Sequence, residues 1–382
     1  MQSGAGHFQA VRTALAAALA VVLLGASGVP ERSDRWWFDT LQAFGASRAP
    51  IPADTVLVLI DEQSLAALGA APFGMRWPWP RTAFAALLAG LRAAGAERVA
   101  VDLVFFESSA AAEQDALLGA VAAGLPGVVL ATVPERAPAV WPEEFRRRHP
   151  ELFAGQARWG VVRSEPDADA VIRAYASPGS LAAAALAAGS AGAGVPDAPV
   201  LLRWRGNLEQ LRAREVPLLP AAPFVVAGWD ILDRAARASP DFDPATLSAA
   251  IAAAPSPAGE VFDRVRGKTV FVGANAAATF DAVATPLGAP EPGVLVHWTA
   301  YANLVQGDFI VPVARPVAWA AALLVVVALV LAGRSGIGLR RPAVIAVLVG
   351  VLFAAGSAGL FLAGAWVAPA LPVAAAVIGF TA

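Results

Sequence analysis

Long stretches without charge at both ends of the chain constrain its fold more than any other feature. The 30 acidic residues of the 382-residue chain all lie between Glu31 and Asp308. Residues 13–30 and 316–333 are each 18 residues long and carry no charge, and no charged residue follows Arg341. A charged side chain in the core of a bilayer costs several kcal/mol, so such stretches predict membrane-spanning helices.

This pattern predicts a charged domain between one membrane span in front and a cluster of spans behind. Residues 31–315 contain 24 of the 28 basic residues and all 30 acidic ones, so their net charge is −6. The whole chain, at 57% hydrophobic residues and a mean hydropathy of +0.60, is too apolar for an ordinary soluble protein. The predicted segments are a cytoplasmic N-terminus (1–12), a first span (13–30), an extracytoplasmic domain (31–315), a second span (316–333), a cytoplasmic loop (334–342), a third span (343–363), a short external turn (364–369) and an incomplete fourth span (370–382).

The basic residues give these spans a direction. Arg12 precedes the first span, while acidic residues follow it. The loop at 334–341 carries three arginines and no acidic residue. Because basic loops stay in the cytoplasm, both observations place the 31–315 domain outside a bacterial inner membrane. The alternative for the first span is a cleaved signal peptide, since the small residues 26–28 follow its apolar core.

The last apolar stretch is short. Residues 370–382 are 13 residues long, which is too few to cross a bilayer alone. We therefore expect the chain to be the front part of a longer protein. The alternative is a genuine terminus in a re-entrant or frayed segment.

The composition argues against several functions. The chain has no cysteine, which excludes disulfides, thiolate metal sites and a cysteine nucleophile. The net-negative middle gives no sign of nucleic-acid binding. The three histidines lack metal-ligand spacing, and Gly267-Lys268-Thr269 leads into a strand, whereas a phosphate-binding loop leads into a helix. The sequence thus predicts no catalytic site, no metal and no cofactor.

Alternating strands and helices predict an α/β fold for the extracytoplasmic domain. Short β-branched runs indicate buried strands, and Leu87, Leu88 and Leu91 are spaced as on one helix face. This order predicts right-handed βαβ units and a mostly parallel sheet, with a surface insertion at 133–158. The predicted strands are 55–60, 98–105, 127–132 and 269–273, and the predicted helices are 65–68, 81–94, 113–123 and one within 182–194.

Five sequence segments resemble the CHASE2 family of bacterial extracytoplasmic sensor domains. They are LVLIDEQSLAALG (57–69), RWPWPR (76–81), ERVAVDLVFFE (97–107), GKTVFVGANAAATFDAVATPLG (267–288) and PGVLVHWTAYANLVQGDFI (292–310). The resemblance covers about residues 35–312 and is weak over 133–260. It implies one span, a sensor, three further spans and then a cytoplasmic effector such as a cyclase or kinase, which these residues do not include. It implies an extracytoplasmic ligand without identifying it.

Acidic residues follow the predicted strands where ligands usually bind in open parallel sheets. Asp61 ends the first strand, Asp102 lies near the end of the second, and Asp281 follows the last. They are candidates to bind a cation, to accept hydrogen bonds from a ligand, or to hold Arg81. The structural alternatives are that Asp61 caps a helix and that Asp102 pairs with Arg81 or with a backbone N–H.

The segment 76–81 is the sharpest local motif. Prolines at 78 and 80 fix the backbone, so Trp77 and Trp79 are presented from a rigid loop just before Arg81. A stiff tryptophan pair could stack on an aromatic or cationic ligand. Equally, both indoles could cover one end of the sheet core.

These observations predict a membrane-bound sensor module that transmits an extracytoplasmic signal across the lipid bilayer. Small residues such as Gly350 and Ala354 would allow a homodimer through the membrane helices. The alternative is the regulatory front half of a nucleotide cyclase or protein kinase whose catalytic domain lies beyond residue 382. A third possibility is a domain that only scaffolds partner proteins.

Overall fold

The chain forms two compact units. A computed structural model describes residues 2–381 except 106, 108, 110, 134–157, 163, 177, 190–194, 239–243 and 334–339. Residues 47–308 form an α/β unit, and residues 1–46 together with 309–382 form a helical unit. Most of the predicted insertion at 133–158, and most of the predicted cytoplasmic loop, lie outside the described residues.

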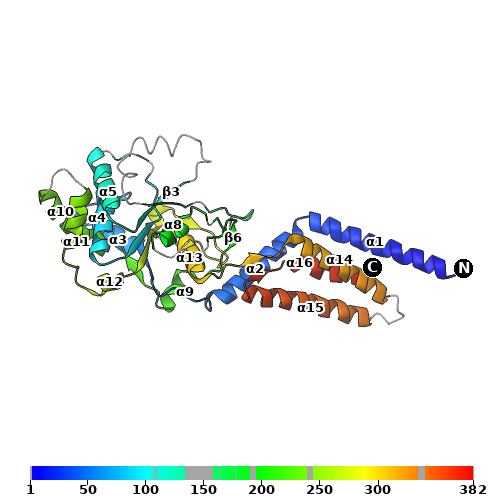
Figure 1. The fold of residues 1–382 in the computed structure, drawn as a ribbon. Helices are drawn as coiled ribbons and strands as arrows, with labels where there is room; N and C mark the ends of the chain where they lie inside the picture. The colour runs from blue at the N-terminus through cyan, green and yellow to red at the C-terminus, as the bar shows by residue number, and fades with distance from the viewer. Residues whose placement is uncertain are drawn as a thin grey trace. The chain divides into compact units, whose positions relative to one another are not determined.

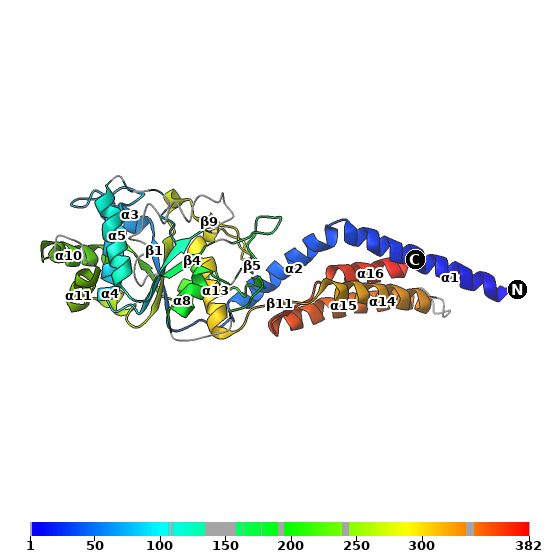
Figure 2. The same cartoon turned by 45° about the horizontal axis from the view of Figure 1, so that its top comes forward.

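The α/β unit is built on a six-stranded parallel sheet with the strand order β4-β3-β2-β8-β1-β7, and Figure 2 shows its strands between two layers of helices. The prediction of an α/β fold with a mostly parallel sheet is therefore confirmed. The strands are β1 (Thr55–Ile60), β2 (Arg98–Val101), β3 (Val128–Thr132), β4 (Arg158–Val161), β7 (Leu218–Pro220) and β8 (Thr269–Ala274).

The strand of this sheet that comes last in the sequence, β8, lies between the first two, β1 and β2. Val270 of β8 pairs with Val56 of β1 on one side and with Val99 of β2 on the other. All six residues of β1 and of β8 are buried, as expected for strands covered on both faces. The predicted strand 98–105 was too long. Strand β2 ends at Val101, and the last hydrogen bond to β8 is the one that the Asp102 N–H donates to the Val272 carbonyl; beyond it the chain leaves the sheet.

Two layers of helices cover the sheet (Figure 1). Helices α4, α5, α10 and α11 pack together on one face, and α8 and α13 lie against the other. The helices are α3 (Glu62–Gly69), α4 (Arg81–Ala93), α5 (Ala112–Gly124), α8 (Leu181–Ala187), α9 (Leu208–Ala213), α10 (Ala222–Ala238), α11 (Pro244–Ala253), α12 (Glu260–Asp263) and α13 (Gly293–Gln306). The smaller elements are β5 (Ala174–Tyr175), β6 (Val200–Leu201), η1 (Ala277–Thr279), β9 (Ala282–Val283) and β10 (Glu291–Pro292).

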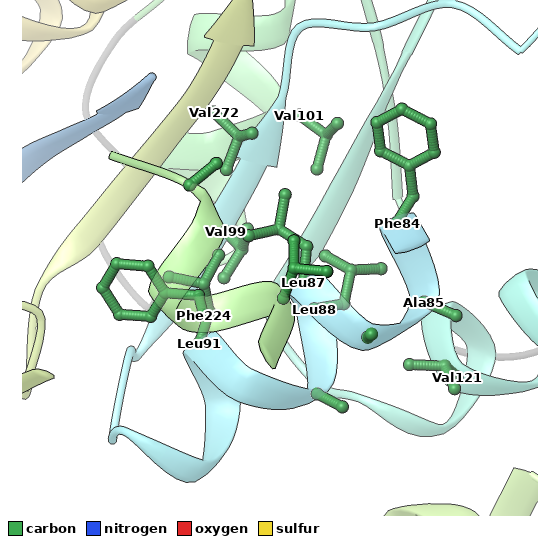
Figure 3. Close-up of a cluster of buried hydrophobic side chains, with 14 of the residues drawn as sticks. Phe84, Ala85, Leu87, Leu88, Leu91, Val99, Val101, Val121, Phe224 and Val272 are labelled. Carbon is green, nitrogen blue, oxygen red and sulfur yellow. The ribbon is translucent and has the colours of Figure 1, made fainter. Parts of the chain in front are cut away.

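The main hydrophobic core lies between the sheet and α4. Figure 3 shows the leucines predicted to share a face of α4 pointing toward the valines of β2 and β8. Leu87 and Leu91 are at most 1% exposed. Burying a side chain of this size contributes about 1.5–3 kcal/mol, so this face fixes α4 on the sheet.

Glycines let α4 and α10 approach closely. A Cβ atom on Gly90 would lie 2.0 Å from the Phe224 carbonyl oxygen, and one on Gly228 would lie 1.8 Å from that of Ala86. Both distances are far inside van der Waals contact, so only glycine fits at either position. The two helix backbones therefore touch at this crossing.

Helix α13 packs closely on the opposite face. A Cβ atom on Gly273 of β8 would lie 2.3 Å from the Val294 Cβ, so β8 contacts α13 with no space between them. Further along, the Trp298 indole N–H donates to the Thr55 hydroxyl over 3.1 Å. Helix α13 is thereby fixed to the two central strands.

The helical unit contains five helices and one short strand pair among its described residues. Its small core includes Ala17, Val21, Val326 and Ala375. Asp34 caps the last helix, because its carboxylate accepts from the Ala370 N–H over 2.8 Å. The elements are α1 (Gln2–Ala26), α2 (Val29–Ala46), β11 (Val311–Pro312), α14 (Arg315–Gly333), α15 (Arg340–Leu362), β12 (Ala365–Trp366) and α16 (Ala370–Thr381).

By length and composition, one described helix is able to cross a bilayer, at Val344–Leu362. A second span results if Val11–Ala26 and Val29–Ala46, which meet at a 64° bend, count as one. Arg315–Leu331 and Ala370–Phe380 are apolar but shorter. The number of spans and their direction therefore stay predictions.

Candidate functional site

The carboxyl edge of the sheet brings three chain segments together. Strands β1, β8 and β2 are adjacent and parallel, so the residues that follow them meet at one edge. Asp61 follows β1, Asp102 follows β2, and Asp281 lies in the segment after β8. Of these three carboxylates, Asp102 and Asp281 belong to one cluster and Asp61 does not.

Asp102 lies at the end of β2 with its carboxylate almost out of contact with water. Its side chain is 9% exposed, and the imidazole of His297 lies beside it, with 3.7 Å between Asp102 Oδ1 and His297 Nε2. That distance is too long for a hydrogen bond. Burial raises the pKa of Asp102 from 3.8 to about 7.

Asp281 is close enough to Asp102 for their charges to interact. Burial, and to a smaller extent the nearby Asp102 carboxylate, raise the pKa of Asp281 from 3.8 to about 7. The Asp281 backbone accepts from the Gly293 N–H over 3.1 Å. A Cβ atom on Gly293 would lie 2.8 Å from Asp281 Oδ1, so the first turn of α13 rests against this carboxylate.

His297 and Tyr175 complete the cluster from the other elements. His297 lies on the buried face of α13, and its Nδ1 is 2.7 Å from the hydroxyl of Tyr175 on β5. Burial lowers the pKa of His297 to about 3 and raises that of Tyr175. Hydrogen bonds to the Tyr175 hydroxyl from Ser180 and from the Ala182 backbone oppose that rise.

The cluster is therefore held mainly in its neutral form. A 3.7 Å contact between a carboxylate and an imidazole could indicate an ion pair, which would lower the pKa of Asp102 and raise that of His297. Both pKa values move in the opposite direction, because burial disfavours both charges. We conclude that Asp102 and His297 are neutral neighbours near pH 6.

The other predicted site residues lie outside this cluster. Asp61 caps α3, since its Oδ1 accepts from the Ser64 N–H over 2.8 Å. The Arg81 guanidinium binds Asp115 over 3.1 Å, rather than Asp102, and also donates to the Glu107 carbonyl. Asp61 and Arg81 thus each have a structural partner of their own.

The two tryptophans of the RWPWPR segment pack on the core. Their rings meet edge to face with 5.9 Å between centroids. Trp79 is 3% exposed and belongs to the main core, and Trp77 packs against that core and against Phe84. This placement matches the alternative in which the indoles cover one end of the sheet.

A second polar cluster lies at the far end of α13. The side chain of Arg205 is fully buried and binds Asp308 through two hydrogen bonds of 2.7 and 2.8 Å. Asn303 of α13 donates to the same carboxylate and also holds the backbone of Arg203. Arg214 donates to the Ala49 carbonyl over 2.6 Å. These hydrogen bonds attach both ends of the α/β unit to its interior, because Ala49 lies just after the first residue of the unit and Asp308 is its last residue.

Sequence reasoning found the two carboxylates and missed the residues that surround them. His297 and Tyr175 are separated by 122 positions, and no local motif joins them. The only local signal was a histidine within an otherwise apolar helical run. In the described part of the chain, no three His, Asp or Glu side chains are arranged to hold a metal ion.

Comparison with protein families gives one match. The CHASE2 domain model matches residues 16–334, which is most of the chain. No curated protein and no solved structure gives a significant match.

Proposed function

Because the chain belongs to the CHASE2 family of sensor domains, we propose that it senses an extracytoplasmic signal and transmits it across a membrane. The α/β unit would receive the signal at the cluster of Asp102, Asp281, His297 and Tyr175. The helices of residues 1–46 and 309–382 would carry the signal through the bilayer. An effector such as a nucleotide cyclase or a protein kinase would be the recipient.

The course of α13 supports this proposal most directly. Its first residue, Gly293, rests against Asp281, and His297 lies one turn further along. Asn303 near its other end binds the carboxylate of Asp308, where the chain leaves the α/β unit. At 1.5 Å per residue, about 15 Å of helix separates Gly293 from Asn303. A single rigid element thus joins the candidate input site to the outgoing chain.

Transmission along α13 requires two arrangements that a signal stabilises to different extents. Any change in charge or occupancy at Asp102 and Asp281 acts directly on the first turn of α13. Because Gly273 and Val294 leave no space between β8 and α13, the first turn of α13 has no room to repack locally, and the helix would have to shift as a body together with its contact on β8. A movement of its far end would alter the bonds of Asn303 and Arg205 to Asp308.

The test is hydrogen exchange measured by mass spectrometry on the full chain in lipid nanodiscs. Asp102→Asn mimics the neutralised site, and Asp61→Asn is the matched control, since it removes a carboxylate at the same sheet edge while asparagine still caps α3. We expect Asp102→Asn to change exchange around Asn303 and in α14, and Asp61→Asn to act only locally. Changes confined to the surroundings of Asp102 would refute transmission.

Membrane orientation has its own test. A phosphatase that is active only outside the cytoplasm, fused within the 334–341 loop, should be inactive in cells. The same fusion placed after Ala49 should be active. Activity of the loop fusion would overturn the proposed direction of the spans.

A further inference from the structure

We infer that a cleft between α3, α10 and α12 binds a small uncharged organic molecule with an apolar body and one hydrogen-bonding group. The cleft has a volume of about 480 Å³ and lies beside β7, the edge strand of the sheet. It shares no lining residue with the cluster of Asp102 and Asp281. The inference therefore goes beyond the proposed function and is independent of whether that cluster receives a signal.

The cleft lies at the carboxyl edge of the sheet. Pro220, the last residue of β7, lines it, and two of its walls come from α3 and α10, which follow β1 and β7 in the chain. Ligands of open parallel sheets bind outside the carboxyl ends of the strands. The volume of about 480 Å³ also lies within the range of about 300–1,000 Å³ that is typical of small-molecule sites. Position and size therefore suit a small molecule rather than a protein partner.

The lining of the cleft is apolar except for one side chain. Val226 of α10, which is 38% exposed, and Phe262 of α12 contribute large apolar groups. No described residue of the lining is charged, and Gln63 of α3 is its one polar side chain. A charged ligand would lose its hydration here without an opposite charge to replace it. The Gln63 amide can donate or accept a hydrogen bond, so it fits one uncharged polar group.

The amino end of α10 does not make the cleft an anion site. Free amide groups at the start of a helix are the donors that bind anions. Here the Ala222 amide donates to the Ser64 hydroxyl over 3.2 Å, and Pro223 has no N–H. The amides of Phe224 and Val225 donate to the carbonyl of residue 221 over 3.1 and 3.2 Å. The contacts left for a ligand are therefore the apolar walls and Gln63.

Hydrogen bonds and ring packing fix the walls of the cleft relative to one another. The Ser64 hydroxyl joins α3 to the start of α10, because it accepts from the amides of Ala221 and Ala222 over 2.9 and 3.2 Å. Phe262 meets the fully buried Phe224 of α10 edge to face, with 5.3 Å between ring centroids. The three helices that form the cleft are thereby held in place.

Prolines further stiffen the lining. Pro220, Pro223 and Pro257 fix the backbone at three points around the cleft. A cleft with fixed walls cannot close on itself, so its apolar surface stays in water until another molecule covers it. Covering that surface is favourable through the hydrophobic effect, and a preformed site spends little free energy on ordering.

Protection of a single thiol from alkylation tests the inference. The chain has no cysteine, so Ala67→Cys gives a unique thiol in the wall of the cleft. Ala66→Cys is the matched control, because Ala66 is exposed on the same helix and does not line the cleft. Each full-length variant, in lipid nanodiscs, reacts with a charged, water-soluble maleimide. The probes are benzyl alcohol and benzylammonium, which have nearly the same size and differ in charge.

We expect benzyl alcohol to protect one thiol and not the other. A molecule of this size should bind with a Kd of about 1–10 mM. At about twice that Kd, benzyl alcohol should slow alkylation of Ala67→Cys by about threefold and that of Ala66→Cys by less than about 1.3-fold. Benzylammonium should slow neither reaction by more than about 1.3-fold.

A second substitution tests the hydrogen-bonding group. Adding Gln63→Leu to Ala67→Cys should raise the Kd of benzyl alcohol by about two- to tenfold, and an unchanged Kd would refute the role of Gln63. The inference as a whole would be overturned by no protection of Ala67→Cys up to about 20 mM benzyl alcohol, by equal protection of both thiols, or by equal protection with benzylammonium.

Discussion

Replacing Asp102 with asparagine should change how the stability of the α/β unit depends on pH. In the folded chain, burial raises the pKa of Asp102 from 3.8 to about 7. Between about pH 4 and pH 7 the folded state therefore holds a proton that the unfolded chain has lost. The contribution of Asp102 to the free energy of unfolding is therefore fully present below about pH 4 and is lost as the pH rises through about 7. Asp102→Asn removes that loss because the amide does not ionise.

The magnitude follows from the pKa difference. A rise from 3.8 to about 7 corresponds to a penalty on the order of 4 kcal/mol for charging Asp102 in the folded state. Loss of the Asp102 charge also removes one cause of the raised pKa of Asp281. We therefore expect Asp102→Asn to stabilise the unit by about 2–4 kcal/mol at pH 8 and by almost nothing near pH 4.

His297 contributes in the opposite direction. Burial lowers the pKa of its imidazole to about 3, so the unfolded chain binds a proton at a higher pH than the folded chain. Stability from His297 is present above about pH 6.5 and is lost as the pH falls toward 3. In Asp102→Asn this gain remains, but the raised pKa of Asp281 opposes it above about pH 4, so the stability of the variant should depend on pH less than that of the wild type.

Urea unfolding of the full chain in detergent, followed by tryptophan fluorescence over a series of pH values, measures these slopes. Asp61→Asn serves as the control, because its carboxylate caps α3 in the same edge of the sheet. Because the buried Asp281 carboxyl still ionises in the variant, the expected result is a wild-type stability that declines more steeply toward pH 8 than that of Asp102→Asn. Parallel pH profiles for the wild type and Asp102→Asn would refute the reasoning about burial at this site.

Four further substitutions test the packing. Gly228→Ala places a Cβ 1.8 Å from the Ala86 carbonyl oxygen, so it should destabilise the α/β unit by at least about 1–3 kcal/mol. Gly69→Ala is the control, because its Cβ would lie 3.6 Å from the nearest atom and the substitution should be neutral or stabilising. The urea midpoints of the two variants give the comparison. Trp79→Ala should cost about 3–5 kcal/mol by the same assay, and a cost below about 1 kcal/mol would mean that the indole is not part of the core. Arg205→Ala leaves the carboxylate of Asp308 without its bidentate partner and should lower the free energy of unfolding by about 3–5 kcal/mol. An unchanged urea midpoint would contradict the burial of this ion pair.

The central strands could be predicted from sequence because their signals are local. β1 and β8 are continuous β-branched runs, and both lie in the sheet almost as predicted. The edge strands β4 and β7 were not predicted, since they are only four and three residues long and carry no such run. The end of β2 was misplaced because the apolar residues after Asp102 continue the pattern after the chain has left the sheet.

The candidate site could be predicted only in part for a similar reason. The positions of Asp102 and Asp281 follow from the general geometry of parallel sheets, which places strand ends at one edge. The partners of charged residues depend on tertiary packing that no local pattern specifies. Arg81 binds Asp115 on α5, and His297 meets Tyr175 from a part of the chain where the sequence resemblance is weak.

A double-mutant cycle between the two ends of α13 tests the central claim most directly. Asp102→Asn changes the charge at the input cluster, and Arg205→Lys replaces the bidentate bond to Asp308 with a single charged group. Free energies of unfolding of the full chain give the coupling, with Asp61→Asn in place of Asp102→Asn as the control cycle. If α13 joins the two ends, the Asp102–Arg205 pair should be non-additive by more than about 0.5 kcal/mol and the control cycle additive. Additivity of both cycles would contradict the account.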